Sequence, residues 1–335
     1  MARQKSTTDV APLYLGMEIG GTKLQIVIGP ATGQIIDRRR FVIDPAEGAK
    51  GILAQIGSGL DSLLARHTPA AIGVGYGGPV DWRSGRIWRS YHIEGWSDFP
   101  LAKWLGERTR LPVFVDNDGN VAALGEAHHG AGGGCDSVVY VTLGSGVGAG
   151  LVIDGAIYHG QVPGELELGH VRLNEAGLIV QERCSGWAVD AIVREAVRTS
   201  PDSILARICT KTAAAKAGGE ARHLAAAISQ KCAVAQVILD GTMRQLALAL
   251  SHGVHLVHPQ IIIIGGGLSL LGEPLRHSLA TQLPEFLMDA FQPGPTIALA
   301  ALAEDAVPIG AITLAAMRSC GAKTGGPAPS LRPDR

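Results

Sequence analysis

Glycine-rich turns that directly follow apolar segments are the parts of this chain best suited to chemistry. Residues 20–22 (Gly-Gly-Thr) follow one such segment, residues 144–148 (Gly-Ser-Gly-Val-Gly) follow another, and residues 265–267 are three glycines after a third. Turns of this kind present consecutive backbone N–H groups with no side chain in the way, so an anion such as phosphate can approach them closely. Three of them in one chain predict a nucleotide-binding protein.

The surroundings of these turns exclude two common nucleotide motifs. No Walker A pattern, G-x-x-x-x-G-K-[ST], occurs in the chain. Neither of the first two turns opens a helix, as the dinucleotide-binding pattern G-x-G-x-x-G requires, because a further strand follows each. A purely structural alternative remains, since hairpins use glycine in their turns whether or not they bind a ligand.

The elements that must position these turns occur twice along the chain. β-Branched and alternating residues predict strands over 13–19 and 23–28, joined by the first glycine turn, and a third antiparallel strand over 34–43. The same order of strand, glycine turn, strand and tight turn returns at residues 138–155. Two lobes that begin alike are therefore expected.

Helices and further strands complete each predicted lobe. The first continues with a helix over 46–66, a strand over 71–76, a helix over 101–108, a strand over 113–115 and a helix over 121–128. The second has helical periodicity within 186–257, a buried strand over 260–264, a strand near 296–299 and a helix that ends near residue 317.

This pattern predicts the domain boundaries. We expect an N-terminal α/β lobe over residues 12–128 and a C-terminal α/β lobe over 129–305, with the glycine-rich stretch 130–135 at the junction. A C-terminal helix over 306–320 is expected to pack back on the N-terminal lobe. The tail over 321–335, rich in Gly, Pro and charge, is expected to be disordered.

The composition narrows the class of protein. The 335 residues are 46% hydrophobic and 18% charged, with a formal net charge of −1, and no apolar run reaches the roughly 18 residues of a membrane span. A near-neutral chain offers no cationic field for nucleic acid, so neither a membrane nor a nucleic-acid partner is expected. Five scattered cysteines without a C-x-x-C pair, and an N-terminus without an apolar signal segment, predict reduced thiols in a cytoplasmic protein.

Four motifs in order make the chain resemble a known family over roughly residues 13–318. Residues 18–23 (Glu-Ile-Gly-Gly-Thr-Lys) are similar to a first phosphate motif, 117–126 to a sugar and base motif, 143–148 to a second phosphate motif, and 167–170 (Glu-Leu-Gly-His) to a sugar-binding signature. These motifs resemble those of the ROK family (repressors, open reading frames and sugar kinases), within the actin-like ATPase superfamily.

The resemblance implies both a fold and an activity. The fold would be α/β and two-lobed, of the actin-like ATPase (ribonuclease H-like) type, with mixed sheets flanked by helices and a central cleft. The activity would use ATP and magnesium to phosphorylate a hexose hydroxyl, and conversion of glucose to glucose 6-phosphate is the first expectation. A homodimer is also expected, because apolar helices lie between residues 222 and 257.

The resemblance assigns nucleotide contacts and a catalytic base. Asp118 is the expected base, since a sugar hydroxyl is a poor nucleophile and needs a carboxylate to orient it and take its proton. An ordinary helix N-cap is the alternative role of Asp118. The expected phosphate and adenosine contacts are Gly20, Gly21, Thr22, Lys23, Gly144, Ser145, Gly146, Gly266 and Gly267.

The resemblance also implies a set of sugar contacts: Gly78, Asn117, Asp118, Glu167, His170 and Glu182. Gly78 belongs to a loop whose backbone would lie beside the sugar. The segment before Glu182 is shorter than in the family, so either Glu182 or Gln181 can be the equivalent contact. Glu167 and His170 could alternatively form a metal pair, although glycines frame them as a loop and further ligands are missing.

Two departures from the family pattern bear on metals. The cysteine-rich zinc loop, C-x-C-G-x-x-G-C, is absent and only Cys184 lies nearby, so no zinc site is expected. Glu18 stands where the family usually has Asp near magnesium. Glutamate keeps the charge but is one methylene longer, and we expect it to remain competent, with magnesium held through water.

Other functions stay open at this stage. The substrate could be N-acetylmannosamine, N-acetylglucosamine, fructose or allose, and the donor could be polyphosphate. A non-catalytic sugar sensor would explain Glu18. A sugar-responsive repressor would need a winged helix-turn-helix ahead of the first strand, where only about a dozen residues stand.

Overall fold

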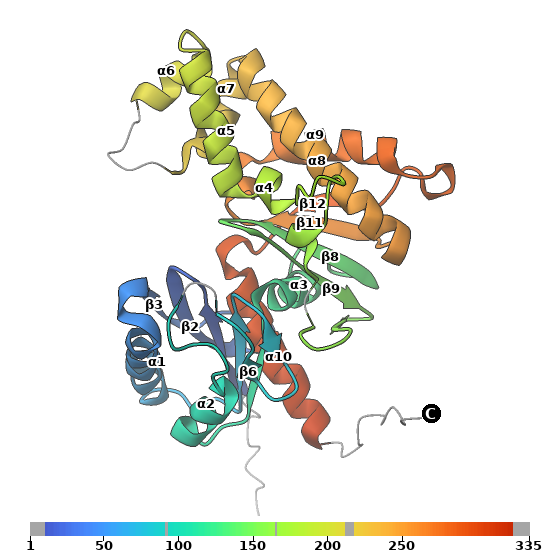
Figure 1. Ribbon diagram of the computed structural model, residues 1–335. Coiled ribbons are helices and arrows are strands. Elements are labelled where there is room, and N and C mark those ends of the chain that lie inside the picture. The colour runs from blue at the N-terminus through green and yellow to red at the C-terminus, as the bar shows by residue number, and fades with distance from the viewer. Residues whose placement is uncertain (1–10, 91–92, 165, 212–217, 324–335) are drawn as a thin grey trace, which may run out of the picture. The chain divides into compact units, whose positions relative to one another are not determined.

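The computed structural model describes residues 11–90, 93–164, 166–211 and 218–323, and of Lys211 and residues 321–323 it describes the backbone alone (Figure 1). The chain forms two compact units. The first comprises Met1–Asp118 and Val307–Arg335, and the second comprises Gly119–Ala306. The sequence placed the boundary after residue 128, so the two divisions differ by most of one helix.

The first unit is built on a mixed five-stranded sheet in the order β3-β2-β1-β4-β7. β1 pairs antiparallel with β2, β2 pairs antiparallel with β3, and β1, β4 and β7 run parallel. The glycine turn between β1 and β2 fixes this hairpin, as the sequence predicted. The strands are β1 (Leu13–Ile19), β2 (Lys23–Pro30), β3 (Asp37–Val42), β4 (Ile72–Tyr76) and β7 (Val113–Asn117).

One face of this sheet is covered by α1 (Gly48–Leu64). Asp44 starts the preceding 3-10 turn (Pro45–Glu47) by accepting a hydrogen bond from the N–H of Ala46. The apolar stripe of α1 then packs on the inward side chains of β1 and β2. A small hairpin, β5 (Val80–Asp81) with β6 (Arg86–Ile87), and α2 (Leu101–Thr109) complete this side.

The opposite face of the first sheet is covered by α10 (Ala306–Lys323), the last helix of the chain. Two glycines allow its backbone to lie directly on the strands. A Cβ on Gly16 would lie 2.5 Å from the carbonyl oxygen of Pro308, and a Cβ on Gly73 would lie 1.9 Å from that of Ala311. Any side chain at these positions would therefore push the helix away from the sheet.

The second unit repeats the same strand order, β10-β9-β8-β11-β12. The antiparallel pairs β8–β9 and β9–β10 again carry the hairpin, while β8, β11 and β12 are parallel. The strands are β8 (Ser137–Leu143), β9 (Val147–Ile153), β10 (Ala156–Ile157), β11 (Ile261–Gly265) and β12 (Thr296–Leu299).

Helix α3 (Asp118–His129) lies against this second sheet. A Cβ on Gly150 of β9 would lie 2.4 Å from the carbonyl oxygen of Gly119, so the first turn of α3 packs directly on the backbone of β9. The fully buried carboxylate of Glu126 accepts hydrogen bonds from the N–H groups of Ala131, Ala301 and Leu302. These contacts explain why α3 belongs to the second unit although it directly follows a strand of the first.

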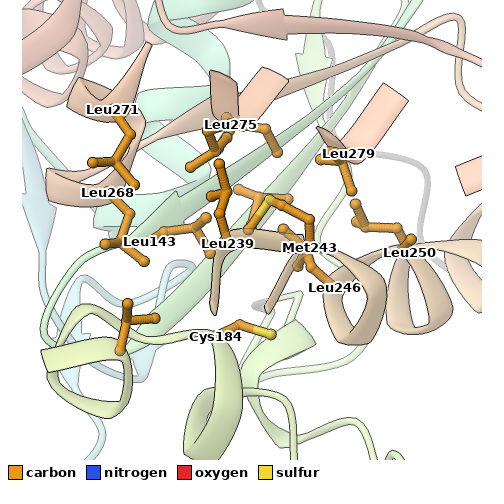
Figure 2. Close-up of a cluster of buried hydrophobic side chains, with 14 of the residues drawn as sticks. Leu143, Cys184, Leu239, Met243, Leu246, Leu250, Leu268, Leu271, Leu275 and Leu279 are labelled. Carbon is orange, nitrogen blue, oxygen red and sulfur yellow. The ribbon is translucent and has the colours of Figure 1, made fainter. Parts of the chain in front are cut away.

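Helices cover the other face of the second sheet and enclose the larger hydrophobic core. Figure 2 shows Leu143 of β8 and Cys184 of α4 among leucines of α8, α9 and the turn after β11. The described part of the predicted helical stretch 186–257 contains α5 (Gly186–Thr199), α6 (Ile204–Lys211), α7 (Leu224–Ser229) and α8 (Ala233–Val257). The short helix α4 (Gln181–Cys184) precedes this stretch, and α9 (Glu273–Gln282) follows β11.

Short 3-10 turns connect the elements of the second unit: Leu168–His170, Glu220–His223, Gly267–Leu271, Leu283–Phe286, Asp289–Phe291 and Ala303–Asp305. Among the described residues, no helix is long and apolar enough to cross a bilayer. At the C-terminus α10 extends to Lys323. The first three residues of the predicted disordered tail are thus helical, and the remainder, 324–335, lies outside the described residues.

Candidate active site

The first predicted phosphate turn joins β1 to β2 and leaves its backbone open. The N–H of Gly20 donates to the carbonyl oxygen of Lys23 at 2.9 Å, and the N–H of Ile43 donates to that of Thr22 at 3.0 Å. Gly21 and Thr22 are exposed, and a Cβ on Gly21 would meet nothing within 4 Å. These backbone hydrogen bonds fix the turn, and no side chain blocks the approach of a phosphate group to it.

Glu18 lies two residues before this turn, and both of its carboxylate oxygens are engaged. Its Oε1 is 3.1 Å from the Nζ of Lys23, and its Oε2 accepts from the Nε2 of Gln25 at 2.8 Å. The described residues contain no group of three or more His, Cys, Asp or Glu that could hold a metal. A single carboxylate beside a phosphate site nevertheless fits magnesium, which takes one or two protein carboxylates and completes its shell with water and phosphate oxygens.

The predicted base, Asp118, is brought to the first phosphate turn by Gly77. Asp118 is the first residue of α3, and Gly77 follows β4. A Cβ on Gly77 would lie 3.2 Å from the Oδ2 of Asp118 and 3.5 Å from the Cα of Gly20. The carboxylate and the glycine turn therefore meet at the carboxyl ends of β1, β4 and β7, within the first unit.

Two neighbours of Asp118 complete this part of the site. The Nδ2 of Asn117 donates to the carbonyl oxygen of Gly78 at 3.2 Å, which joins two of the predicted sugar contacts. Burial raises the pKa of the Tyr76 hydroxyl, the hydrogen bond to Ser90 opposes the shift, and the charge of Asp118 acts with burial. Tyr76 is thus neutral at physiological pH and lies within the electrostatic reach of Asp118.

The second phosphate turn joins β8 to β9 in the second unit. The N–H of Gly144 donates to the carbonyl oxygen of Gly146 at 3.0 Å, and the N–H of Gly186, in the first turn of α5, donates to that of Gly144 at 2.7 Å. Ser145 is exposed at the tip. This turn is also open, and nothing in it is charged.

The predicted adenosine glycines lie beside that second turn. Gly266 has a φ of 78°, and its Cβ would lie 2.6 Å from the backbone nitrogen of Leu143, the residue before the turn. Only glycine fits this approach. Gly267 is exposed, and a Cβ there would meet nothing within 4 Å. The two glycine segments of the second unit therefore lie side by side.

Glu167 precedes, and His170 ends, a 3-10 turn that is packed on the start of β9. The N–H of His170 donates to the carbonyl oxygen of Glu167 at 3.0 Å, and both side chains are exposed. Gly169 between them allows the contact, because its Cβ would lie 2.3 Å from the carbonyl oxygen of Val147. The structure thus places this predicted sugar segment next to the second phosphate turn.

The structure distinguishes Gln181 from Glu182. The Oε2 of Glu182 accepts from the N–H of Ile179 at 3.1 Å, at the start of its own short helix. The Oε1 of Gln181 lies 3.4 Å from the Cβ positions of both Gly146 and Gly169. Gln181, rather than the Glu182 favoured from sequence, is therefore the side chain between the sugar segment and the phosphate turn.

Cys184 is a packing residue of the second core. It is fully buried, its Sγ donates to the carbonyl oxygen of Thr242 at 3.6 Å, and burial raises the pKa of its thiol to about 12. A neutral thiol in apolar surroundings is a poor metal ligand.

Sequence reasoning missed Gln25 and Gly77. Gln25 is polar at a fully buried position, and the signal was available, because it stands opposite Glu18 in the predicted hairpin. No sequence pattern distinguished Gly77, because its position between the first glycine turn and Asp118 depends on a strand and a helix that are far apart in the sequence.

The two units form an α/β fold with the same strand order and a glycine hairpin in each, and a carboxylate lies beside the first turn. Comparison with known proteins gives the family: the ROK family model matches residues 14–318. The chain belongs to the ROK family, and the predicted α/β fold is confirmed.

The most similar relatives include two glucokinases. That of Halalkalibacterium halodurans is 31% identical over 311 residues, which is 89% of this chain and 93% of the relative. That of Thermotoga maritima is 29% identical over 308 residues, 90% of this chain and 96% of the relative. Among solved structures, a ROK family glucokinase from Streptomyces griseus in complex with glucose and AMPPNP has a TM-score of 0.80 and 28% identity, covering 91% of this chain and 99% of that one.

Proposed function

We propose that this chain transfers the γ-phosphoryl group of ATP to glucose and forms glucose 6-phosphate. One observation carries the proposal: the Asp118 carboxylate and the Gly20 turn approach the same glycine, at 3.2 and 3.5 Å from its Cβ position. A base next to a phosphate site is the pairing that phosphoryl transfer to a hydroxyl requires. The two relatives named glucokinase support glucose as the expected sugar.

Asp118 would orient the attacking sugar hydroxyl and accept its proton as the phosphoryl group is transferred. The open backbone N–H groups would hold the phosphate oxygens on which negative charge accumulates. We assign phosphate contacts to Gly20, Gly21, Thr22, Lys23, Gly144, Ser145 and Gly146, and adenosine contacts to Gly266 and Gly267. Magnesium, when bound with the nucleotide, would neutralise phosphate charge, and Glu18 is the carboxylate positioned to hold it.

We assign sugar contacts to Gly78, Asn117, Asp118, Glu167 and His170. Gln181 joins them as the alternative to Glu182, on the geometry described above. Amide, carboxylate and imidazole groups suit vicinal hydroxyls, and each lost partner leaves a polar group unsatisfied at about 1–3 kcal/mol. A homodimer and a cytoplasmic location are part of the proposal as sequence-based predictions.

The test is sugar-dependent release of ADP from magnesium-ATP. The panel contains glucose, mannose, fructose, allose, N-acetylmannosamine and N-acetylglucosamine, with polyphosphate as a second donor. We expect the highest kcat/KM with glucose and ATP. A higher kcat/KM with an N-acetylhexosamine would show that glucose is not the preferred substrate, and a higher value with polyphosphate would show that ATP is not the preferred donor. Sugar binding measured by calorimetry without any turnover would identify a sensor.

A further inference from the structure

A row of polar side chains crosses the first sheet beside the phosphate turn. Glu18 of β1 pairs with Gln25 of β2, and Gln25 pairs with Arg40 of β3. Residues directly opposite one another in antiparallel strands place their side chains on the same face. Arg38, two residues before Arg40 on the edge strand β3, lies on that face as well.

The side chain of Gln25 links this row through direct hydrogen bonds. Its Nε2 donates to the Oε2 of Glu18 at 2.8 Å. Its Oε1 accepts from the Nε of Arg40 at 2.8 Å and from the Nη1 of Arg38 at 3.1 Å. Guanidinium groups only donate, so they fix which end of the amide is the oxygen, and the amide N–H must then face Glu18.

Burial gives this link its significance. Gln25 is fully buried, as are its apolar neighbours Leu24 and Ile26 in the same strand. A polar side chain at this buried position therefore stands out from the rest of the strand. A buried amide is unfavourable unless its hydrogen bonds are made, and here both of its ends are engaged. The bonds of Gln25 therefore serve to hold its partner, the carboxylate of Glu18.

Glu18 is held at two points as a result. Lys23 lies 3.1 Å from one oxygen and Gln25 lies 2.8 Å from the other. A glutamate has one more rotatable bond than an aspartate, and two contacts remove the freedom that this bond adds. An aspartate at the same place would be one methylene too short to keep both contacts.

We propose that Gln25, oriented by Arg38 and Arg40, is a positioning residue that fixes the Glu18 carboxylate for nucleotide-bound magnesium. The inference rests on the proposed function and deepens it. It explains how a glutamate works at this position, and it predicts that this chain requires Glu18 as long as Gln25 is present. Glu18→Asp should therefore weaken magnesium-dependent nucleotide binding instead of leaving it unchanged.

The test compares Gln25→Leu, Glu18→Gln, the double variant and the control Gln55→Leu. Gln55 lies on α1, which covers the face of Leu24 and Ile26, and its amide donates to the backbone carbonyl of Val42. Calorimetry measures AMPPNP affinity with magnesium and with EDTA, so the readout does not depend on turnover. We expect Gln25→Leu to reduce the gain in affinity from magnesium by at least about tenfold and to leave the EDTA value unchanged.

The double variant decides whether Gln25 acts through Glu18. If it does, Gln25→Leu has no further effect in the Glu18→Gln background. Additive losses, or a Gln25→Leu value equal to that of Gln55→Leu, would overturn the proposal. If Gln25→Leu does not fold, Arg40→Met on the exposed edge strand is the substitute, and it should reduce the same gain by a smaller factor.

The failure of this inference can be told apart from the failure of the proposed function. A wild-type chain that binds AMPPNP in a magnesium-dependent way but transfers nothing to sugar would refute the kinase proposal. The same calorimetric comparison of variants would still support or overturn the role of Gln25.

Discussion

The two units share a scaffold and differ at the residues that flank their turns. Both sheets have the same strand order, and both hairpins present open glycine backbone. In the first hairpin the last pair but one before the turn is Glu18 and Gln25, whereas in the second it is Thr142 and Gly148. The first turn is therefore bordered by fixed charges, and the second is neutral.

This difference shows that the same strand arrangement can carry charged side chains beside its glycine turn or neutral ones. A glycine turn after a strand needs only backbone to receive a phosphate. Magnesium and proton transfer need carboxylates, and Glu18 and Asp118 both belong to the first unit. The second turn, with Thr142 and Gly148 beside it, keeps the open glycine backbone without these charges.

The largest expected effect comes from removing the base of the first unit. Asp118→Asn should lower kcat about 10²- to 10⁴-fold, because the amide cannot accept the hydroxyl proton. Glucose affinity measured by calorimetry should stay within a few-fold. Asp98→Asn is the control, since the side chain of Asp98 is 83% exposed. Turnover of Asp118→Asn within tenfold of wild type would mean that Asp118 is only a helix cap.

The next effect tests the shared scaffold. Gly73→Val under α10 and Gly150→Val under α3 should each lower the free energy of unfolding by about 3 kcal/mol, because each new side chain would collide with helix backbone. Gly241→Ala on α8 meets nothing within 4 Å, and should raise stability by up to about 1 kcal/mol. Urea unfolding measures all three. A tolerated valine at either site would show that its helix is not held directly on the strands.

A smaller effect is expected from giving the second hairpin the charge of the first. Thr142→Glu places a carboxylate near the phosphates without the Lys23 and Gln25 contacts that hold Glu18. We expect KM for ATP to rise about fivefold, corresponding to a repulsion of ~1 kcal/mol. Thr142→Gln is the matched neutral control. Equal KM values for the two variants would show that the second turn lies away from the phosphates.

The smallest effect concerns the edge strand of the first sheet and its pH dependence. A hydrogen bond from His67 at 3.0 Å holds the pKa of the Asp37 carboxyl below its ordinary value, although burial opposes the shift. Because the pKa of this carboxyl is lower in the folded than in the unfolded state, its ionised form stabilises the fold above about pH 4. This stabilisation is lost as the pH falls further. Asp37→Asn should therefore lower the melting temperature by about 2 °C at pH 7 and have less effect at pH 3. An equal loss at both values would exclude the ionised carboxylate as the cause.

Local patterns predicted the hairpins, the glycine turns and the parallel strands, because each depends on a few neighbouring residues. The boundary at residue 128 differed from the observed division, since α3 follows one sheet and packs on the other through Gly150 and Glu126. The stretch 186–257 has helical periodicity, and the structure divides its described residues among α5, α6, α7 and α8. Helical periodicity shows where a face is apolar but not where a short loop interrupts it.

The glycine turns were predictable from motifs, whereas contacts between distant side chains were not. The motifs singled out Asp118, and the structure places it beside the first turn. The position of Gln181, rather than Glu182, between the sugar segment and the second turn depends on the path of a 3-10 turn onto β9. Predicting the contact between Gln25 and Glu18 requires the register of the hairpin, which strand pairing specifies but composition does not.

Product analysis tests the central claim most directly. Wild-type chain is mixed with magnesium-ATP and ¹³C6-labelled glucose, and the products are followed by ³¹P and ¹³C NMR. The account predicts glucose 6-phosphate and ADP in equal amounts, with the phosphoryl group on the C6 oxygen. ADP with free phosphate and unmodified glucose, or a phosphoryl group on another hydroxyl, would contradict it.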